Sequence, residues 1–290
     1  MNAGPKADSE RDSKNTPLLP IAWQPLTPRG VAAFVETSVG RVFLVELFFA
    51  LLAAAGVIWF LHDNWFATVR EAIRNLPQRG KILAGQLNWY EQSPVILASS
   101  HFLSLTVDLG HSDSKGREAQ VCVEFRRNEV RVISLIGYLQ VGYPKKNVVS
   151  FNRPELEPWW GAWQPMVFAG TAIGVVAYLF VCWSSLATVY SFIALLIAFF
   201  ANKKLSWSES WKLSSAALMP GALFLVAATV VYGLGWIDLI RLGYAVAFHL
   251  VIGWVYVFVS PFFLPRNPNI ERQTKNPFFG GTGENRKAEE

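Results

Sequence analysis

Residues 176–204, VAYLFVCWSSLATVYSFIALLIAFFANKK, decide how this chain folds, because all but the last two lie in a segment from 164 to 202 that contains no charged residue. A membrane-crossing helix needs only about 20 apolar residues. A straight helix over the whole segment would measure roughly 58 Å, against a hydrocarbon core of about 30 Å. The segment therefore either crosses a membrane once with a long remainder, or turns at Trp183-Ser184-Ser185 and crosses back.

Charge can be counted under both arrangements. If the segment makes one net crossing, the N-terminal tail, the lysine-rich stretch after 202 and the C-terminal tail share one side. The excess of Lys and Arg in cytoplasmic loops assigns that side to the cytoplasm. If the segment crosses twice, the polar middle of the chain joins the lysines inside, and the N-terminal tail is exported. Charge by itself excludes neither arrangement.

The composition is that of a membrane protein. Of the 290 residues, 52% are hydrophobic, 14% are aromatic and 16% are charged, whereas a soluble chain has roughly 25% charged residues. The net charge of +5 is scattered between apolar blocks, so membrane loops explain it better than a nucleic-acid site does. The two cysteines predict no disulfide and no metal site.

The organisation follows from the alternation of polar and apolar blocks. The sequence predicts an α-helical membrane protein with an inserted small antiparallel β (α+β) soluble domain. Its predicted parts are a disordered N-terminal tail at 1–40, a first transmembrane helix at 41–62, an extracytoplasmic β-rich domain at 66–160, a helical membrane bundle at 164–264 with crossings near 164–202, 213–234 and 239–264, and a disordered C-terminal tail at 266–290.

Several local patterns support this division. An amphipathic helix is predicted over 67–76, where Pro77 stops it. HFLSLTVDL alternates apolar and polar residues with the period of a strand, and QVCVEFRRNEVRVIS predicts a hairpin turning at Arg127-Asn128. About five mainly antiparallel strands are expected over 80–150. The three prolines of PELEPWWGAWQP, 154–165, predict a break before the membrane, and NKKLSWSESWKLS reads as a polar linker.

No catalytic, cofactor-binding or metal-binding constellation is found, and the protein is predicted not to be an enzyme. Ionisable residues and prolines within membrane helices are instead the functional hypotheses. These candidate membrane positions are Glu46, Pro220, Asp238, Arg241 and His249.

Each candidate also has a structural reading. Glu46 is shallow enough to reach the lipid headgroups or to pair locally, one turn from Arg41. Pro220 either kinks a helix or starts one. Asp238 and Arg241 form a local ion pair at a helix start or belong to a substrate site.

The fourth histidine and a set of small residues complete the candidates. His249 either titrates within the membrane or makes a hydrogen bond for helix packing. Ala216, Ala217, Gly221 and Ala222 form a small-residue face that suits close packing, internally or in a homo-oligomer.

Three stretches resemble an uncharacterised bacterial family of integral membrane proteins, a domain-of-unknown-function family placed near the Yip-type membrane proteins. They are PLTPRGVAAFVETSVGRVFLVELFFALL, NLPQRGKILAGQLNW with the later HFLSLTVDLG, and KKLSWSESWKLSSAALMPGALF. The chain differs from the family in being richer in Trp and in having a less acidic loop. The resemblance implies a cytoplasmic N-terminus, an extracytoplasmic loop domain and no established activity. With one net crossing at 164–202, the C-terminus is also predicted to be cytoplasmic.

With this resemblance, the sequence predicts a helix from about 164 to 183 that crosses, followed by a bent or offset continuation to 202 that does not return. The predicted location is the bacterial cytoplasmic (inner) membrane. The expected partners are the lipid bilayer and a protein of the cell envelope, which the β domain would bind or sense. The alternative is a component of a lipid or small-solute transporter.

Overall fold

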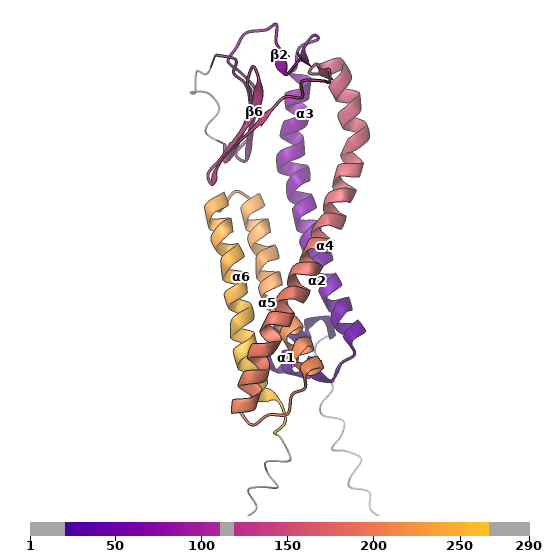
Figure 1. The fold of residues 1–290 in the computed structure, drawn as a ribbon, viewed down its shortest axis with the longest axis vertical. Helices are drawn as coiled ribbons and strands as arrows, with labels where there is room; N and C mark the ends of the chain where they lie inside the picture. The colour runs from indigo at the N-terminus through magenta and orange to yellow at the C-terminus, as the bar shows by residue number, and fades with distance from the viewer. Residues whose placement is uncertain (1–20, 111–118, 267–290) are drawn as a thin grey trace, which may run out of the picture. The chain divides into compact units, whose positions relative to one another are not determined.

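The computed structural model describes residues 21–110 and 119–266 (Figure 1). Contacts divide the chain into two compact units, and each of the four long helices contributes residues to both. The first unit comprises Met1–Glu46, Ser185–Pro220 and Gly253–Glu290, and the second comprises Leu47–Ser184 and Gly221–Ile252. The predicted C-terminal tail, apart from Arg266, lies outside the described residues.

Most of the described chain is helical. The helices are η2 (Ile21–Leu26), α1 (Pro28–Ala33), η3 (Phe34–Glu36), α2 (Val39–Phe60), η4 (Leu61–Phe66), α3 (Ala67–Arg74), α4 (Arg153–Phe200), α5 (Trp207–Gly233), α6 (Leu239–Val259) and η5 (Ser260–Phe263). Helical geometry continues from Val39 to Arg74, through the π-helical turn η4. The predicted amphipathic helix at 67–76 therefore continues the first long helix.

The uncharged segment at 164–202 belongs almost entirely to one helix. α4 runs without interruption for 48 residues, so the expected break near Trp183 and Ser184 is wrong. Both residues are enclosed or half-buried, which shows that polar side chains inside a long apolar run can pack against neighbouring helices. The helix also extends beyond the apolar segment at its N-terminal end, where it begins at Arg153.

That extension corrects a second expectation, that prolines would break the chain between 154 and 165. Pro154 lies in the first turn, where a missing N–H costs nothing, and Asn152 caps this turn by accepting a hydrogen bond from the Glu155 N–H at 3.1 Å. Pro158 and Pro165 lie inside α4. Each removes one backbone hydrogen bond, and the helix continues past both.

The predicted polar linker before the third crossing is also helical. α5 begins at Trp207, six residues before the expected 213, because Ser206 and Glu209 form a capping box. The Ser206 N–H donates to Glu209 Oε2 at 2.7 Å, and the Glu209 N–H donates to Ser206 Oγ at 3.4 Å. This Ser-x-x-Glu pattern was present in the sequence and was missed.

Residues 21–36 depart from the expected disordered tail. They form η2, α1 and η3, and Thr27 caps α1 by accepting a hydrogen bond from the Gly30 N–H at 3.1 Å. Val31 and Phe34 are completely buried. Burial of these side chains offsets the entropy of ordering the segment.

Eight strands form two sheets in the second unit. They are β1 (Lys81–Leu83), β2 (Gln86–Asn88), β3 (Val95–Ser99), β4 (Leu103–Val107), β5 (Val121–Phe125), β6 (Glu129–Ser134), β7 (Gly137–Gly142) and β8 (Val149–Ser150). The small sheet has the order β2-β1-β8, and the large one has the order β3-β4-β5-β6-β7.

The expected hairpin at Arg127-Asn128 is confirmed, because β5 and β6 pair in antiparallel register from Val121↔Ser134 to Phe125↔Val130. The sheet is mixed, however, since β4 and β5 are parallel. Alternation of side chains is the same in parallel and antiparallel strands, so the sequence pattern could not distinguish them.

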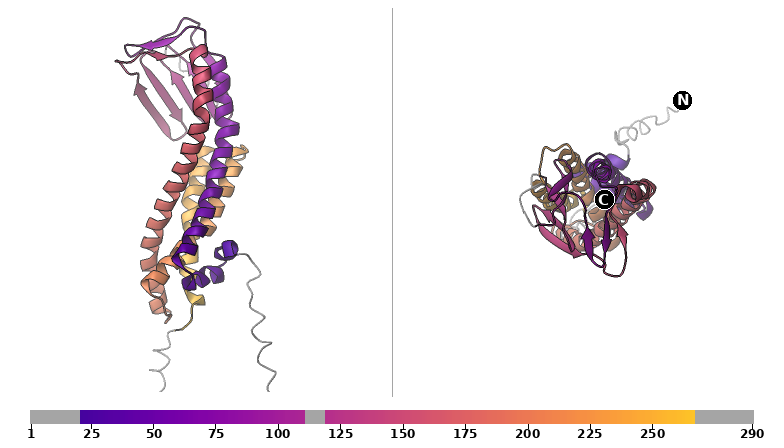
Figure 2. Two further views of the ribbon diagram at one scale, coloured as in Figure 1. Left: turned by 90° about the vertical axis from the view of Figure 1, so that its right-hand side faces the viewer. Right: turned by 90° about the horizontal axis from the view of Figure 1, so that it is seen from above.

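The β domain, defined as β1 to β8, packs on helices of the second unit (Figures 1 and 2). Its core joins Leu76 of the α3 end to Leu97, Val107 and Phe151. The start of α4 lies beside α3, where the Arg74 Nε is 3.9 Å from Glu157 Oε1.

Two contacts in the second unit relate the level of α4 to the end of α5. Asn64 Nδ2 donates to the Gly233 oxygen at 3.4 Å, and the rings of His62 and Phe168 are 5.9 Å apart. Phe168 therefore lies near the level at which α5 ends. The preceding part of α4, from Arg153, extends roughly 22 Å beyond that level at 1.5 Å per residue. This extension carries the β domain.

Candidate functional site

Glu46 lies in the interior of the first unit and not at a surface. Its side chain is 0% exposed, and its Oε1 accepts a hydrogen bond from the Ser215 hydroxyl of α5 at 2.5 Å. Among the described residues, Glu46 Oε2 has no hydrogen-bond partner. Glu46 thus pairs with a residue of another helix, and not with the neighbouring Arg41.

Further serines make the first unit polar inside. Ser210 of α5 donates to the Ser191 oxygen of α4 at 2.6 Å, and Lys212 donates to the backbone oxygens of Val35 and Thr37. These bonds connect α5 to α4 and to the N-terminal turns. Sequence reasoning missed the serines, although Ser210, Ser214 and Ser215 recur at helical spacing.

Pro220 lies well inside α5, so the helix-start reading is wrong. The next residue marks a close approach between two helices: a Cβ added at Gly221 would lie 2.4 Å from the His249 backbone oxygen of α6. The His249 ring bonds through Nδ1 to the Val246 oxygen of its own helix. The histidine side chain thus makes a local bond, and its backbone supplies the packing surface.

Asp238 and Arg241 form the local pair that the structural reading expects. The Arg241 N–H donates to Asp238 Oδ1 at 2.7 Å, which caps α6, and Arg241 Nε lies 3.8 Å from Asp238 Oδ2. The Arg241 side chain is exposed and Asp238 is half-buried. Among the described residues, no hydrogen bond or ion pair joins His249 to this pair.

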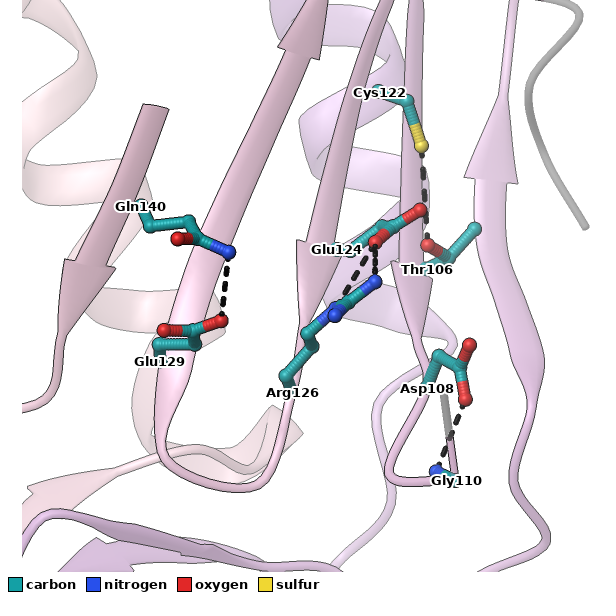
Figure 3. A network of polar contacts seen from close by, with 8 residues as sticks. All are labelled: Thr106, Asp108, Gly110, Cys122, Glu124, Arg126, Glu129 and Gln140. Carbon is teal, nitrogen blue, oxygen red and sulfur yellow. Dashed lines mark hydrogen bonds and ion pairs between the residues drawn. The ribbon is translucent and has the colours of Figure 1, made fainter. Parts of the chain in front are cut away.

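The β domain contains a buried ion pair that the sequence reasoning did not single out (Figure 3). Arg126 approaches Glu124 Oε2 with its Nη2 at 2.9 Å and its Nε at 3.2 Å, and both side chains are less than 10% exposed. Opposite charges two residues apart on one strand point to the same side of a sheet. That spacing in VEFRR was the available signal.

Three more polar contacts lie along the same sheet (Figure 3). They join Thr106 Oγ1 to Cys122 Sγ at 4.0 Å, the Gly110 N–H to Asp108 Oδ1 at 3.1 Å, and Gln140 Nε2 to Glu129 Oε1 at 3.2 Å. The first and third contacts join β4 to β5 and β6 to β7 by side chains as well as by the backbone ladder, whereas the second lies within the turn after β4.

Tyr143 closes the buried polar network from the end of β7. Its hydroxyl donates to the Arg126 backbone oxygen at 3.1 Å. Burial raises the pKa of the Tyr143 phenol, and the negative charge of Glu129 raises this pKa further. The neutral phenol is therefore the form that the folded domain holds.

A hollow of about 710 Å³ opens at the end of the β domain where β1 and β8 meet the start of α4. It is lined by Gln78, Arg79, Gly80, Lys81, Tyr90, Val148, Ser150, Asn152 and Glu155. The Glu155 carboxylate on the wall of this hollow already accepts two hydrogen bonds, from the Ser150 hydroxyl and from Asn152 Nδ2.

Exposed cations lie in this hollow and along the nearby β1–β2 hairpin. Arg79 and Lys81 line it, the Lys145 side chain packs beside Gly85 of the β1–β2 turn, and the Arg127 oxygen accepts from the Leu87 N–H of β2 at 2.7 Å. Their side chains are exposed. We call this group, with the neighbouring Lys146, the distal basic cluster.

No group of three or more His, Cys, Asp or Glu side chains suited to a metal occurs in 21–110 and 119–266. The expectations of no enzyme activity, no cofactor and no metal stay predictions. The buried polar groups are arranged for packing: each main cluster couples strands or helices to one another.

The comparisons with known proteins place the chain in a family without assigning it an activity. A family model described as "Protein of unknown function (DUF1189)" matches residues 26–260, and the chain belongs to this family. No curated protein matches the chain. No solved structure matches it either. Membership in an uncharacterised family is thus confirmed, and the relation to Yip-type proteins stays a prediction.

Proposed function

We propose that this member of the DUF1189 family is an integral protein of the bacterial cytoplasmic membrane, and that its β domain binds an anionic partner of the cell envelope. In this account the protein has cytoplasmic termini and no enzymatic activity of its own. The β domain lies on the outer side, carried by the extended parts of α2–α3 and α4. The distal basic cluster forms the binding surface.

Four helices are long and apolar enough to cross a membrane: Val39–Arg74, Arg153–Phe200, Trp207–Gly233 and Leu239–Phe263. If each crosses once, the N-terminus, the α4–α5 loop and the C-terminus lie on one side. The β domain and the α5–α6 loop lie on the other. The uninterrupted α4 supports this count, since a return within 164–202 would require a turn.

The observation that carries the orientation is the charge of the two short loops. The α4–α5 loop at 201–206 contains Lys203 and Lys204, whereas the α5–α6 loop at 234–238 contains no Lys or Arg. Positive residues in short loops favour the cytoplasmic side. This contrast supports cytoplasmic termini and an extracytoplasmic β domain.

The distal basic cluster supports the choice of an anionic partner. Arg79 and Lys81 are exposed in the lining of the hollow, Glu155 within it is already hydrogen-bonded, and the exposed Arg127, Lys145 and Lys146 belong to the neighbouring part of the β domain. A surface with one sign of charge steers and retains partners of the opposite sign. Anionic polymers and acidic protein surfaces share the required chemistry.

Binding can be tested with the full chain in nanodiscs of zwitterionic lipid and a fluorescent polyphosphate as the anionic probe. We expect saturable binding that weakens as salt screens the charges. The variant with Arg79→Glu and Lys81→Glu should lose most of this binding. Arg241→Glu has the same type of charge change away from the cluster, and should bind like the unchanged chain. Equal binding by all three proteins would contradict the proposal.

The transporter alternative gains no support from α6. The His249 ring bonds to its own helix and Asp238 caps the first turn. The hollow between α5 and α6 in the second unit is lined mainly by apolar side chains, including Phe224, Phe248 and Val251. A transporter would require a polar path between these two helices.

A further inference from the structure

The turn between β6 and β7 carries large apolar side chains that the protein leaves uncovered. Ile136 is 77% exposed and Leu135 is 51% exposed, and the adjoining Tyr138 and Leu139 of β7 are more than 60% exposed. Every residue of β7 is exposed. Residues 135–139 are called the apolar tip below. A tip of this kind is costly to keep in water.

The strand register places the apolar tip at a defined end of the sheet. Leu103 of β4 pairs with Val121 of β5, and Val121 pairs with Ser134 of β6. Ser134 in turn pairs with Gly137 across the turn. The tip therefore lies at the end of the sheet where β4 and β5 begin.

That end of the sheet contacts the α5–α6 loop within the second unit. The Leu239 N–H at the start of α6 donates to Gln120 Oε1 at 3.0 Å. The Phe102 ring lies 5.1 Å from Tyr232 of α5 and 5.2 Å from Phe60 of α2. Figure 1 shows the lower end of the sheet near the adjacent ends of α5 and α6. The apolar tip thus lies at the level where two apolar helices end.

We infer that the apolar tip inserts into the interfacial layer of the lipid bilayer. The inference rests on the proposed function in one respect, that α5 and α6 cross the membrane. Their ends at Gly233 and Leu239 then mark the boundary of the hydrocarbon core. Trp236, in the loop between them, is 73% exposed, and Trp and Tyr favour this boundary. Tyr138 gives the tip a matching aromatic side chain.

A bilayer fits the tip better than a second copy of the chain does. Leu135 and Ile136 lie in a turn, where the backbone reverses and cannot extend a β ladder. Arg131 stacks on the Tyr138 ring at 4.8 Å, which places a cation beside the tip, as suits anionic headgroups. The β domain would then be held at both ends, by helices on one side and by lipid at the tip.

The test uses the full chain in nanodiscs, with a single cysteine at Ile136 labelled by an environment-sensitive fluorophore. Cys122→Ala and Cys182→Ala remove the native thiols. Insertion should shift the emission to the blue, and lipids carrying a nitroxide near the headgroup should quench it more strongly than lipids carrying the nitroxide deep in the acyl chain. Tyr90→Cys, at an exposed distal position, is the matched control and should show neither effect.

A second variant separates insertion from simple proximity. Leu135→Asp with Ile136→Asp, read by a label at Tyr138→Cys, should reduce nitroxide quenching to the level of the Tyr90 control. Emission from Ile136→Cys that is not quenched overturns the inference. A blue shift without quenching also overturns it, because it would indicate a protein cover such as a second copy. Nitroxide quenching reports lipid contact whichever side of the membrane the β domain is on, and it requires no anionic partner. A tip that fails to insert can therefore be distinguished from a β domain that fails to bind an anionic partner.

Discussion

Two enclosed carboxylates, one in each unit, meet different kinds of partner. Glu46 of α2 accepts a hydrogen bond from the hydroxyl of Ser215, whereas Glu124 of β5 faces the guanidinium of Arg126. Both are at most 3% exposed. In the helical unit, an uncharged hydroxyl donates to the buried Glu46 carboxyl. In the β domain, a charged guanidinium pairs with the buried Glu124 carboxylate. The two regions should respond differently when charge is removed.

The largest effect is expected from Arg126→Met. Removal of one partner leaves the Glu124 carboxylate buried without its guanidinium, which costs about 3–5 kcal/mol of unfolding free energy. Hydrogen–deuterium exchange should show the loss in β5 and β6. Arg127→Met, at the exposed neighbouring position, should stay within about 0.5 kcal/mol. Equal effects of both changes would show that the ion pair contributes nothing specific.

Isosteric neutralisation compares the two carboxylates directly. Glu124→Gln should destabilise the β domain by about 3 kcal/mol, since the buried Arg126 then lacks its counter-charge. Glu46→Gln keeps an acceptor for the Ser215 hydroxyl, so the loss should be less than about 1 kcal/mol. Thermal unfolding in detergent, with exchange to assign each transition, measures both. The comparison breaks if Glu46→Gln is the more damaging change.

Ser215→Ala examines the other half of the helical contact. The change removes the donor to Glu46 and should cost about 1–3 kcal/mol, the penalty for a buried polar group left without a partner. Ser208→Ala removes a hydroxyl from an exposed position of α5 and is the control. A Ser215→Ala protein as stable as the unchanged chain would mean that the hydroxyl does not support Glu46.

Tyr143→Phe should cost about 1 kcal/mol, because it removes one neutral hydrogen bond to the Arg126 oxygen without uncovering a charge. The loss should be confined to the β domain in hydrogen–deuterium exchange. Tyr90→Phe, at an exposed site, should leave the exchange unchanged. A larger loss than that of Arg126→Met would reverse the order of importance within the domain.

Alkaline pH gives the smallest and most graded effect. The pKa of Tyr143 is raised in the folded protein above its usual value of 10.0. The unfolded chain then releases its proton first, so the contribution of Tyr143 is complete below about pH 10 and declines as pH rises toward the folded pKa. Urea unfolding followed from pH 9 upward should show a smaller decline for Tyr143→Phe. Identical pH curves would contradict the assignment.

The sequence predicted the parts that depend on periodicity and composition. The long apolar helices, the amphipathic continuation after the first of them and the β5–β6 hairpin all follow from the spacing of apolar residues. The parallel pairing of β4 and β5 did not follow, since register between distant strands is set by tertiary packing. The capping box at Ser206 could have been predicted from its Ser-x-x-Glu pattern. It was not, because the lysines and tryptophans around it favoured the interpretation as a polar linker.

The candidate site shows the same division. Glu46 could be singled out because a carboxyl inside an apolar block is unusual, but its partner Ser215 is 169 residues away in the chain. The Glu124–Arg126 pair has a local spacing and could have been found. The reading of Trp183-Ser184-Ser185 as a break failed because it rested on the length of the apolar segment, whereas α4 continues through these residues as one helix.

The central claim is that α4 crosses once and places the β domain opposite the Lys203-Lys204 loop. It can be measured with single cysteines at Tyr90 and Ser208, in a Cys122→Ala and Cys182→Ala background, and a thiol reagent that does not cross membranes. In intact cells the account predicts labelling of the Tyr90 position only, with Ser208 labelled after the membrane is opened. Labelling of Ser208 in intact cells, or protection of Tyr90, would contradict the proposed orientation.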